Sequence, residues 1–159
     1  MQRINANRIY LTLIIALVFQ ILPWSGFGLY IHPDFVLLVL LYWILRAPKL
    51  CSIGTAWLSG LVIDLATGSL FGQNALAYAL TAFFAVTYQR RLILFTVWQQ
   101  TAYVFLLLIV NQICLLVLKL FAGGENPGWL YFLPCISGIL LWYVVAFSSV
   151  GSHGKSKNN

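Results

Sequence analysis

Six apolar runs, separated by short polar or glycine-containing stretches, cover almost the whole chain. Each run is long enough for a helix of several turns and holds very few charged residues. Runs of this kind are typical of helices that cross a lipid bilayer. The pattern therefore predicts six transmembrane spans and a disordered basic cytoplasmic tail. The spans are expected at about residues 9–24, 33–47, 51–66, 75–89, 101–118 and 129–148, and the tail at 149–159.

The composition supports a membrane protein rather than a water-soluble domain. Hydrophobic residues make up 62% of the chain and charged residues only 8%, whereas about a quarter of the residues are charged in a soluble domain. The length of 159 residues suits a single domain. We therefore expect an all-α polytopic integral membrane protein, folded as one compact bundle of about six transmembrane helices.

The basic residues form separated pairs rather than one patch. Arg46 with Lys49, and Arg90 with Arg91, lie between apolar runs; other basic residues lie near the two ends of the chain, and only Lys119 falls on the opposite side of the predicted membrane. Lys and Arg concentrate in cytoplasmic loops of membrane proteins. Both termini are therefore predicted to be cytoplasmic. No nucleic-acid partner is expected, because no basic stripe is present.

The second predicted span is the shortest. Pro33 is expected in its first turn, where the missing N–H costs nothing, and Asp34 beside it complements the helix dipole. Tyr42 and Trp43 form an aromatic pair near its far end. About 14 helical residues cover only about 21 Å, against a hydrocarbon core about 30 Å thick. This span is therefore short for a bilayer unless the membrane thins locally.

A carboxylate, Asp64, lies at the end of the third apolar run, where ionisable groups are costly. Small residues share its helical face and allow close packing against another helix in a bilayer. The fourth span, which has alanines at positions 75, 79 and 82, is the expected neighbour. The small residues on the face of Asp64 are Ser52, Ala56, Gly60 and Gly68.

Asp64 has three interpretations. It ties the loop of residues 67–74 through backbone N–H groups, it forms part of a docking site for a partner, or it is a titrating proton or cation site. If its role is structural, Asp64→Asn should retain much of the function, because the amide keeps an acceptor. Asn111 and Gln112, in the fifth span, are expected to form interhelical hydrogen bonds.

The sequence contains no recognisable catalytic or metal-binding motif. His32 and His153 belong to loops on opposite predicted faces, and HExxH, GxSxG and P-loop patterns are absent. Three cysteines, Cys51, Cys114 and Cys135, lack metal-ligand spacing and are expected to be buried packing residues. We therefore expect neither enzymatic activity nor a cofactor or metal.

A series of short motifs runs through residues 9–105. It comprises residues 21–24, 33–38, 41–45 with Pro48, 54–55, Gly60 with 64–65, 68–69 with Gly72, and Leu94 with 98–100. In this order the motifs resemble the MreD family of rod shape-determining proteins, particularly its members from Gram-negative bacteria. The residues expected to bind a partner or to form the structural motif are Pro33, Tyr42, Trp43, Gly60, Asp64, Leu65, Gly68, Ser69, Gly72, Trp98, Gln99 and Gln100.

The resemblance implies a noncatalytic scaffold of the cell-elongation complex in the bacterial inner membrane, needed for rod cell shape and lateral peptidoglycan synthesis. Its implied partners are MreC, MreB, and RodA with its transpeptidase, beside the lipid bilayer. It implies no cofactor and no small-molecule substrate. The family's fold is also similar to that of the substrate-binding subunits of vitamin transporters. The alternative function is therefore a small membrane transporter or ligand-binding subunit that uses Asp64.

Overall fold

The computed structural model describes residues 6–22, 32–69, 72–92, 94, 96–124 and 128–154. These residues form six α-helices, one short 3-10 helix and no strand, which confirms the expected all-α class. The helices are α1 (Ala6–Ile21), α3 (Phe35–Arg46), α4 (Ile53–Thr67), α5 (Gln73–Leu92), α6 (Val97–Phe121) and α7 (Leu133–Gly154), with η1 (Trp129–Phe132) before α7.

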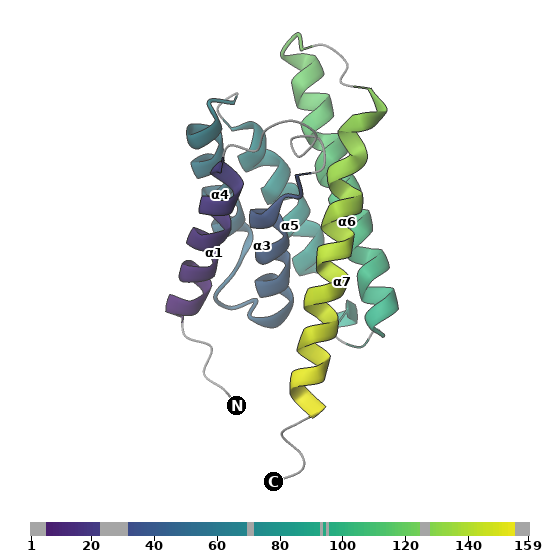
Figure 1. Ribbon diagram of the computed structural model, residues 1–159. Helices are drawn as coiled ribbons and strands as arrows, with labels where there is room; N and C mark the ends of the chain where they lie inside the picture. Colours follow the sequence, from purple (N-terminus) through teal and green to yellow (C-terminus); the bar gives the residue numbers. More distant parts are fainter. Residues whose placement is uncertain are drawn as a thin grey trace.

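The helices alternate in direction along a single bundle. α1 begins and α7 ends at the same end of the bundle, and the far ends of α6 and α7 rise above the other helices (Figure 1). α4 packs along α5, α5 along α6, and α6 along α7, while α1 packs along α3. The predicted pairing of the third and fourth apolar segments is therefore confirmed.

The shortest helix, α3, lies at the centre of the bundle. It packs against α1, α5, α4 and α7. Neighbouring helices therefore cover much of its surface. Seven of its 12 residues are buried: Val36, Leu37, Leu38, Leu40, Leu41, Ile44 and Leu45.

The start of α3 differs from the prediction. Pro33 lies before the helix rather than in its first turn, because Asp34 takes the N-cap position. The Asp34 carboxylate accepts a hydrogen bond from the backbone N–H of Leu37 at 3.1 Å, which satisfies one of the free donors of the first turn. The expected role of Asp34 at the helix start is confirmed.

Two longer helices also extend beyond their predicted bounds. α6 begins at Val97, so Trp98, Gln99 and Gln100 form its first turn instead of a stretch before the helix. The side chain of Gln99 accepts a hydrogen bond from the backbone N–H of Thr96 at 3.2 Å, which stabilises this earlier start.

At the other end of the chain, α7 continues to Gly154, so residues 149–154 of the predicted disordered tail are helical. No proline interrupts them, and each added helical residue gains a backbone hydrogen bond. The predicted end of the first span at residues 23–24 and the last residues of the tail, 155–159, lie outside the described residues.

The two polar residues in the middle of α6, Asn111 and Gln112, differ in their hydrogen bonding. Gln112 donates a hydrogen bond from Nε2 to the backbone carbonyl of Tyr131 at 2.7 Å, so the predicted contact to a neighbouring element is confirmed for this residue. Asn111 is buried, and its Oδ1 has no hydrogen-bond partner within the described part of the chain. Cys51 and Cys135 are buried as expected, whereas Cys114 is half-buried.

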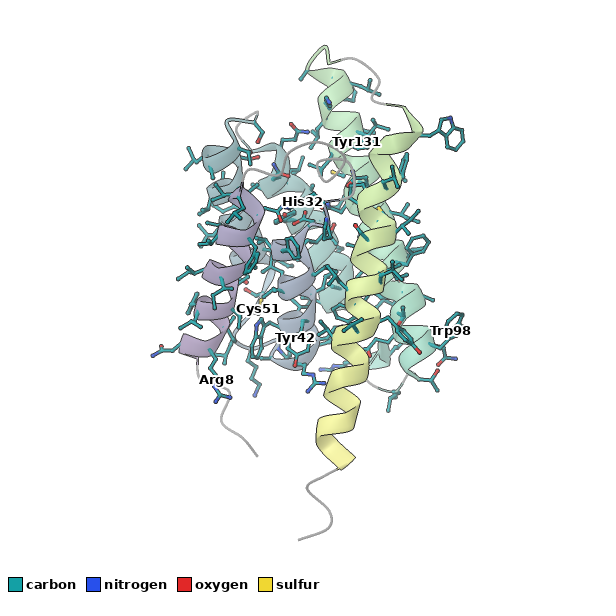
Figure 2. All side chains as sticks on the ribbon, in the orientation of Figure 1. Arg8, His32, Tyr42, Cys51, Trp98 and Tyr131 are labelled. Carbon is teal, nitrogen blue, oxygen red and sulfur yellow. The ribbon has the colours of Figure 1, made fainter. Side chains whose placement is uncertain are left out.

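Large apolar side chains cover much of the outside of the bundle (Figure 2). One helix of the described chain, Trp98–Phe121, is long and apolar enough to cross a membrane. Four shorter apolar helices accompany it, namely Ala6–Ile21, Phe35–Arg46, Ile53–Thr67 and Leu133–Val145. The arrangement with six spans therefore stays a prediction.

Candidate functional site

The carboxylate of Asp64 lies in the last turn of α4 and is 1% exposed. Its Oδ1 accepts hydrogen bonds from Ser69 Oγ at 2.9 Å, from the backbone N–H of Asn74 at 3.0 Å and from Asn74 Nδ2 at 2.8 Å. Its Oδ2 accepts from the backbone N–H groups of Gly72 at 2.9 Å and Ala75 at 3.3 Å. Asp64 thus binds both sides of the segment of residues 67–74, which we call the connector; residues 70 and 71 of it lie outside the description.

Three of these donors are backbone N–H groups at the start of α5, from Gly72, Asn74 and Ala75. The first N–H groups of a helix have no partner within the helix, and a negative charge near them is stabilised by the helix dipole. A carboxylate of α4 therefore caps the next helix in the chain. This is the tie between Asp64 and the loop that the first of its three interpretations predicts.

Gly60 brings the two helices into contact one turn before Asp64. A β-carbon at position 60 would lie 2.4 Å from the Cα of Ala75, 2.6 Å from its backbone nitrogen and 2.7 Å from the carbonyl carbon of Asn74. These distances are far below van der Waals contact, so only glycine fits. The close approach places Asp64 within reach of the N–H groups of α5.

Gly68 and Gly72 are needed for a different reason. Their φ angles are +64° and +94°, in the left-handed region, and a β-carbon at either position would meet open space. The backbone conformation, rather than lack of space, therefore favours glycine. Gly68 ends α4, and the conformation is a common one for a helix C-terminus.

Several other predicted site residues lie away from this carboxylate. Leu65 follows Asp64 in α4 but is 69% exposed, so it faces outward. Tyr42 and Trp98 lie toward the opposite end of the bundle (Figure 2). Trp43, next to Tyr42, donates a hydrogen bond from Nε1 to Thr12 Oγ1 at 2.8 Å and so ties α3 to α1. The predicted residues therefore form two groups, with only the connector group gathered around Asp64.

A second, half-buried carboxylate, that of Asp34, is held by a residue to which no sequence motif points. The hydroxyl of Tyr78, on α5, lies 2.5 Å from Oδ1 and 2.6 Å from Oδ2 of Asp34. Tyr78 is completely buried. The two residues are 44 positions apart, and no local pattern signals such a contact. Asn74, which donates twice to Asp64, is also missing from the predicted site residues.

The charged side chains are divided between the two ends of the bundle. Asp34 begins α3, Asp64 ends α4, and Lys119 lies near the end of α6, so these three share one end. The other described basic residues belong to the opposite end, where α1 begins and α3 and α5 end; they are Arg8, Arg46, Lys49, Arg90 and Arg91. Among the described residues, no group of three or more His, Cys, Asp and Glu side chains could hold a metal ion.

Comparison with known proteins confirms the family resemblance. The profile of the family described as rod shape-determining protein MreD matches residues 1–147. The chain belongs to the MreD family. A curated relative, the rod shape-determining protein MreD of Haemophilus influenzae, is 30% identical over 130 residues, which cover 81% of this chain and 80% of the relative. No solved structure matches the chain significantly.

Proposed function

We propose that this MreD family member is a noncatalytic scaffold of the cell-elongation complex in the inner membrane, with six spans and both termini in the cytoplasm. It acts in rod shape and lateral peptidoglycan synthesis by holding membrane partners together. The family match over residues 1–147 supports the role in shape. The scaffold role is an inference from the site.

The observation that carries the proposal is the set of five hydrogen bonds on Asp64. In the alternative, a transporter or ligand-binding subunit, this acid would bind a proton, a cation or a substrate. Here both of its oxygens are occupied by donors of the connector and of α5. Charge-assisted hydrogen bonds of this kind fix the shape of a segment. We therefore infer that Asp64 holds the connector in shape and does not bind a proton, a cation or a substrate.

The distribution of charge supports the proposed orientation. The end with five basic residues is the cytoplasmic end under the positive-inside rule, which places Asp64 and the connector near the outer face of the membrane. The exposed apolar side chains on the helices then face lipid. In water such a large apolar surface would promote association.

Topology reporters test this placement. Fusions after residues 28, 48, 69, 91, 126 and 156 should report outside and inside alternately, beginning outside and ending inside, because each intervening segment is a predicted span. The position after residue 69 precedes α5, so the fusion does not interrupt that helix. A fusion after residue 156 that reports outside contradicts the orientation.

The end of α4 next to the connector is the proposed docking surface for MreC. Leu65, Ala66, Thr67 and Gly68 are exposed there, and the hydrogen bonds of Asp64 hold the adjacent connector in place. MreC is expected to have one span and an external domain, so it can meet both the exposed last turn of α4 and the outer end of the connector. MreB, RodA and its transpeptidase are proposed to join through the same complex.

Leu65→Ala should reduce the recovery of MreC by affinity capture in mild detergent and should round the cells. Its side chain is 69% exposed, so truncation removes contact area for a partner without opening a cavity. Leu58→Ala is the matched control: it lies two turns earlier on α4 and is 57% exposed. Both variants should reach wild-type protein levels. If the two variants recover MreC equally well, this end of α4 is not the docking surface.

A further inference from the structure

An open hollow of about 580 Å³ lies between the connector with the start of α5 on one side and the end of α6 with η1 on the other. The end of α6 and the start of α7 rise above α4 and α5 at this end of the bundle (Figure 1). Polar and apolar side chains meet in it. Ser69, Asn74, Leu115, Lys119, Ala122 and Tyr131 are among the lining residues.

Lys119 is the basic residue of this hollow. Its Nζ lies 5.9 Å from the centroid of the Tyr131 ring. Within the described part of the chain, neither the ammonium of Lys119 nor the hydroxyl of Tyr131 has a hydrogen-bond partner, and none of the described lining residues is acidic. The nearby carboxylate of Asp64 is occupied by the connector. Lys119 and Tyr131 therefore place two donors side by side in the hollow, where an anionic group that enters from outside would meet them.

We propose that this hollow binds the headgroup phosphate of an anionic phospholipid. Lys119 and Tyr131 supply the donors for the phosphate. Leu115, Ala122 and the ring of Tyr131 offer apolar contact to the glycerol and upper acyl chain, which favours an amphipathic lipid over a free ion.

The surroundings of the hollow agree with a position at the level of the headgroups. Trp129 and Phe121 lie at the same end and are 94% and 87% exposed. Exposed aromatic rings, tryptophan above all, concentrate where hydrocarbon meets headgroups. The proposal rests on the proposed membrane placement but not on any contact with MreC.

Native mass spectrometry of the full chain in mild detergent tests the site, with phosphatidylglycerol and phosphatidylcholine of the same acyl chains in equal amounts. The wild-type protein should retain phosphatidylglycerol preferentially. Lys119→Gln should lower that retention about fivefold, the effect of one cation near a lipid phosphate, and leave phosphatidylcholine unchanged. Lys49→Gln, an exposed basic residue at the opposite end, should behave as wild type.

Ala122→Phe provides a second variant, because it fills the hollow and keeps the charge of Lys119. It should also lower the retention of phosphatidylglycerol, with an unchanged thermal unfolding midpoint in phosphatidylcholine. Excess inorganic phosphate should not displace the lipid. Displacement by phosphate, equal retention by Lys119→Gln and wild type, or an equal loss in Lys49→Gln overturns the proposal. Because the experiment contains only this protein and lipids, none of these outcomes tests the proposed scaffold function.

Discussion

Asp64→Leu is expected to lower the free energy of unfolding by roughly 3 to 5 kcal/mol, because five hydrogen-bond donors lose their acceptor, four of them half-buried and the N–H of Ala75 buried. The start of α5 loses its cap at the same time. Unfolding of the purified protein in mixed micelles, followed by tryptophan fluorescence, measures the loss. Protein levels in cells should fall with it.

Asp64→Asn should also be destabilising, by about 2 kcal/mol. Residue type alone suggests a mild change, since the amide keeps one acceptor oxygen. In the structure, however, every neighbour of the carboxylate is a donor, so the new NH₂ group would face further donors, such as the N–H groups of Gly72 and Ala75. With these donors around it, Asn at position 64 is expected to be destabilising, whereas the sequence alone suggested that it would be tolerated.

Ser69→Ala is the graded control for this series, because it removes one of the five hydrogen bonds, and it should cost about 1 kcal/mol. The expected order of stability is wild type, Ser69→Ala, Asp64→Asn and Asp64→Leu. A different result would be an Asp64→Leu protein that is as stable as wild type in cells that lose their shape. Asp64 would then act through its charge, and this result would favour the alternative function as a transporter.

Gly60→Ala is the second large expected effect. The added methyl group would lie 2.4 Å from the Cα of Ala75, and backbone cannot move aside as a flexible side chain can. The helices must separate, at a cost of about 1–3 kcal/mol or more, and Asp64 is drawn away from the N–H groups of α5. The same unfolding measurement should show the loss, together with weaker recovery of MreC.

Gly54→Ala is a matched control on the same helix. A β-carbon at position 54 meets only Ser52 Oγ, at an ordinary 3.9 Å. Alanine favours helix over glycine, so this variant should lie within about 1 kcal/mol of wild type, on the stabilising side. A Gly60→Ala protein as stable as Gly54→Ala would contradict the close packing of α4 on α5.

Much of the helical architecture follows from the sequence alone. The apolar runs predict each helix to within a few residues in most cases, because a long apolar segment must satisfy its backbone groups internally. The face with Gly60 and Asp64 follows from helical periodicity, and the turn geometry at Gly68 and Gly72 follows from the permissive backbone of glycine. The family resemblance depends on the same local motifs.

Only the tertiary structure shows what these residues contact. It shows which donors occupy Asp64, and it joins Tyr78 to Asp34 across 44 positions. It also packs the short helix α3 against four other helices and places Lys119 in one hollow with Ser69 and Asn74 of the connector. Hydrophobicity, periodicity and glycine content are properties of neighbouring residues, so they can be read along the chain. Contacts between helices depend on which faces pack together, and this is decided when the whole bundle forms.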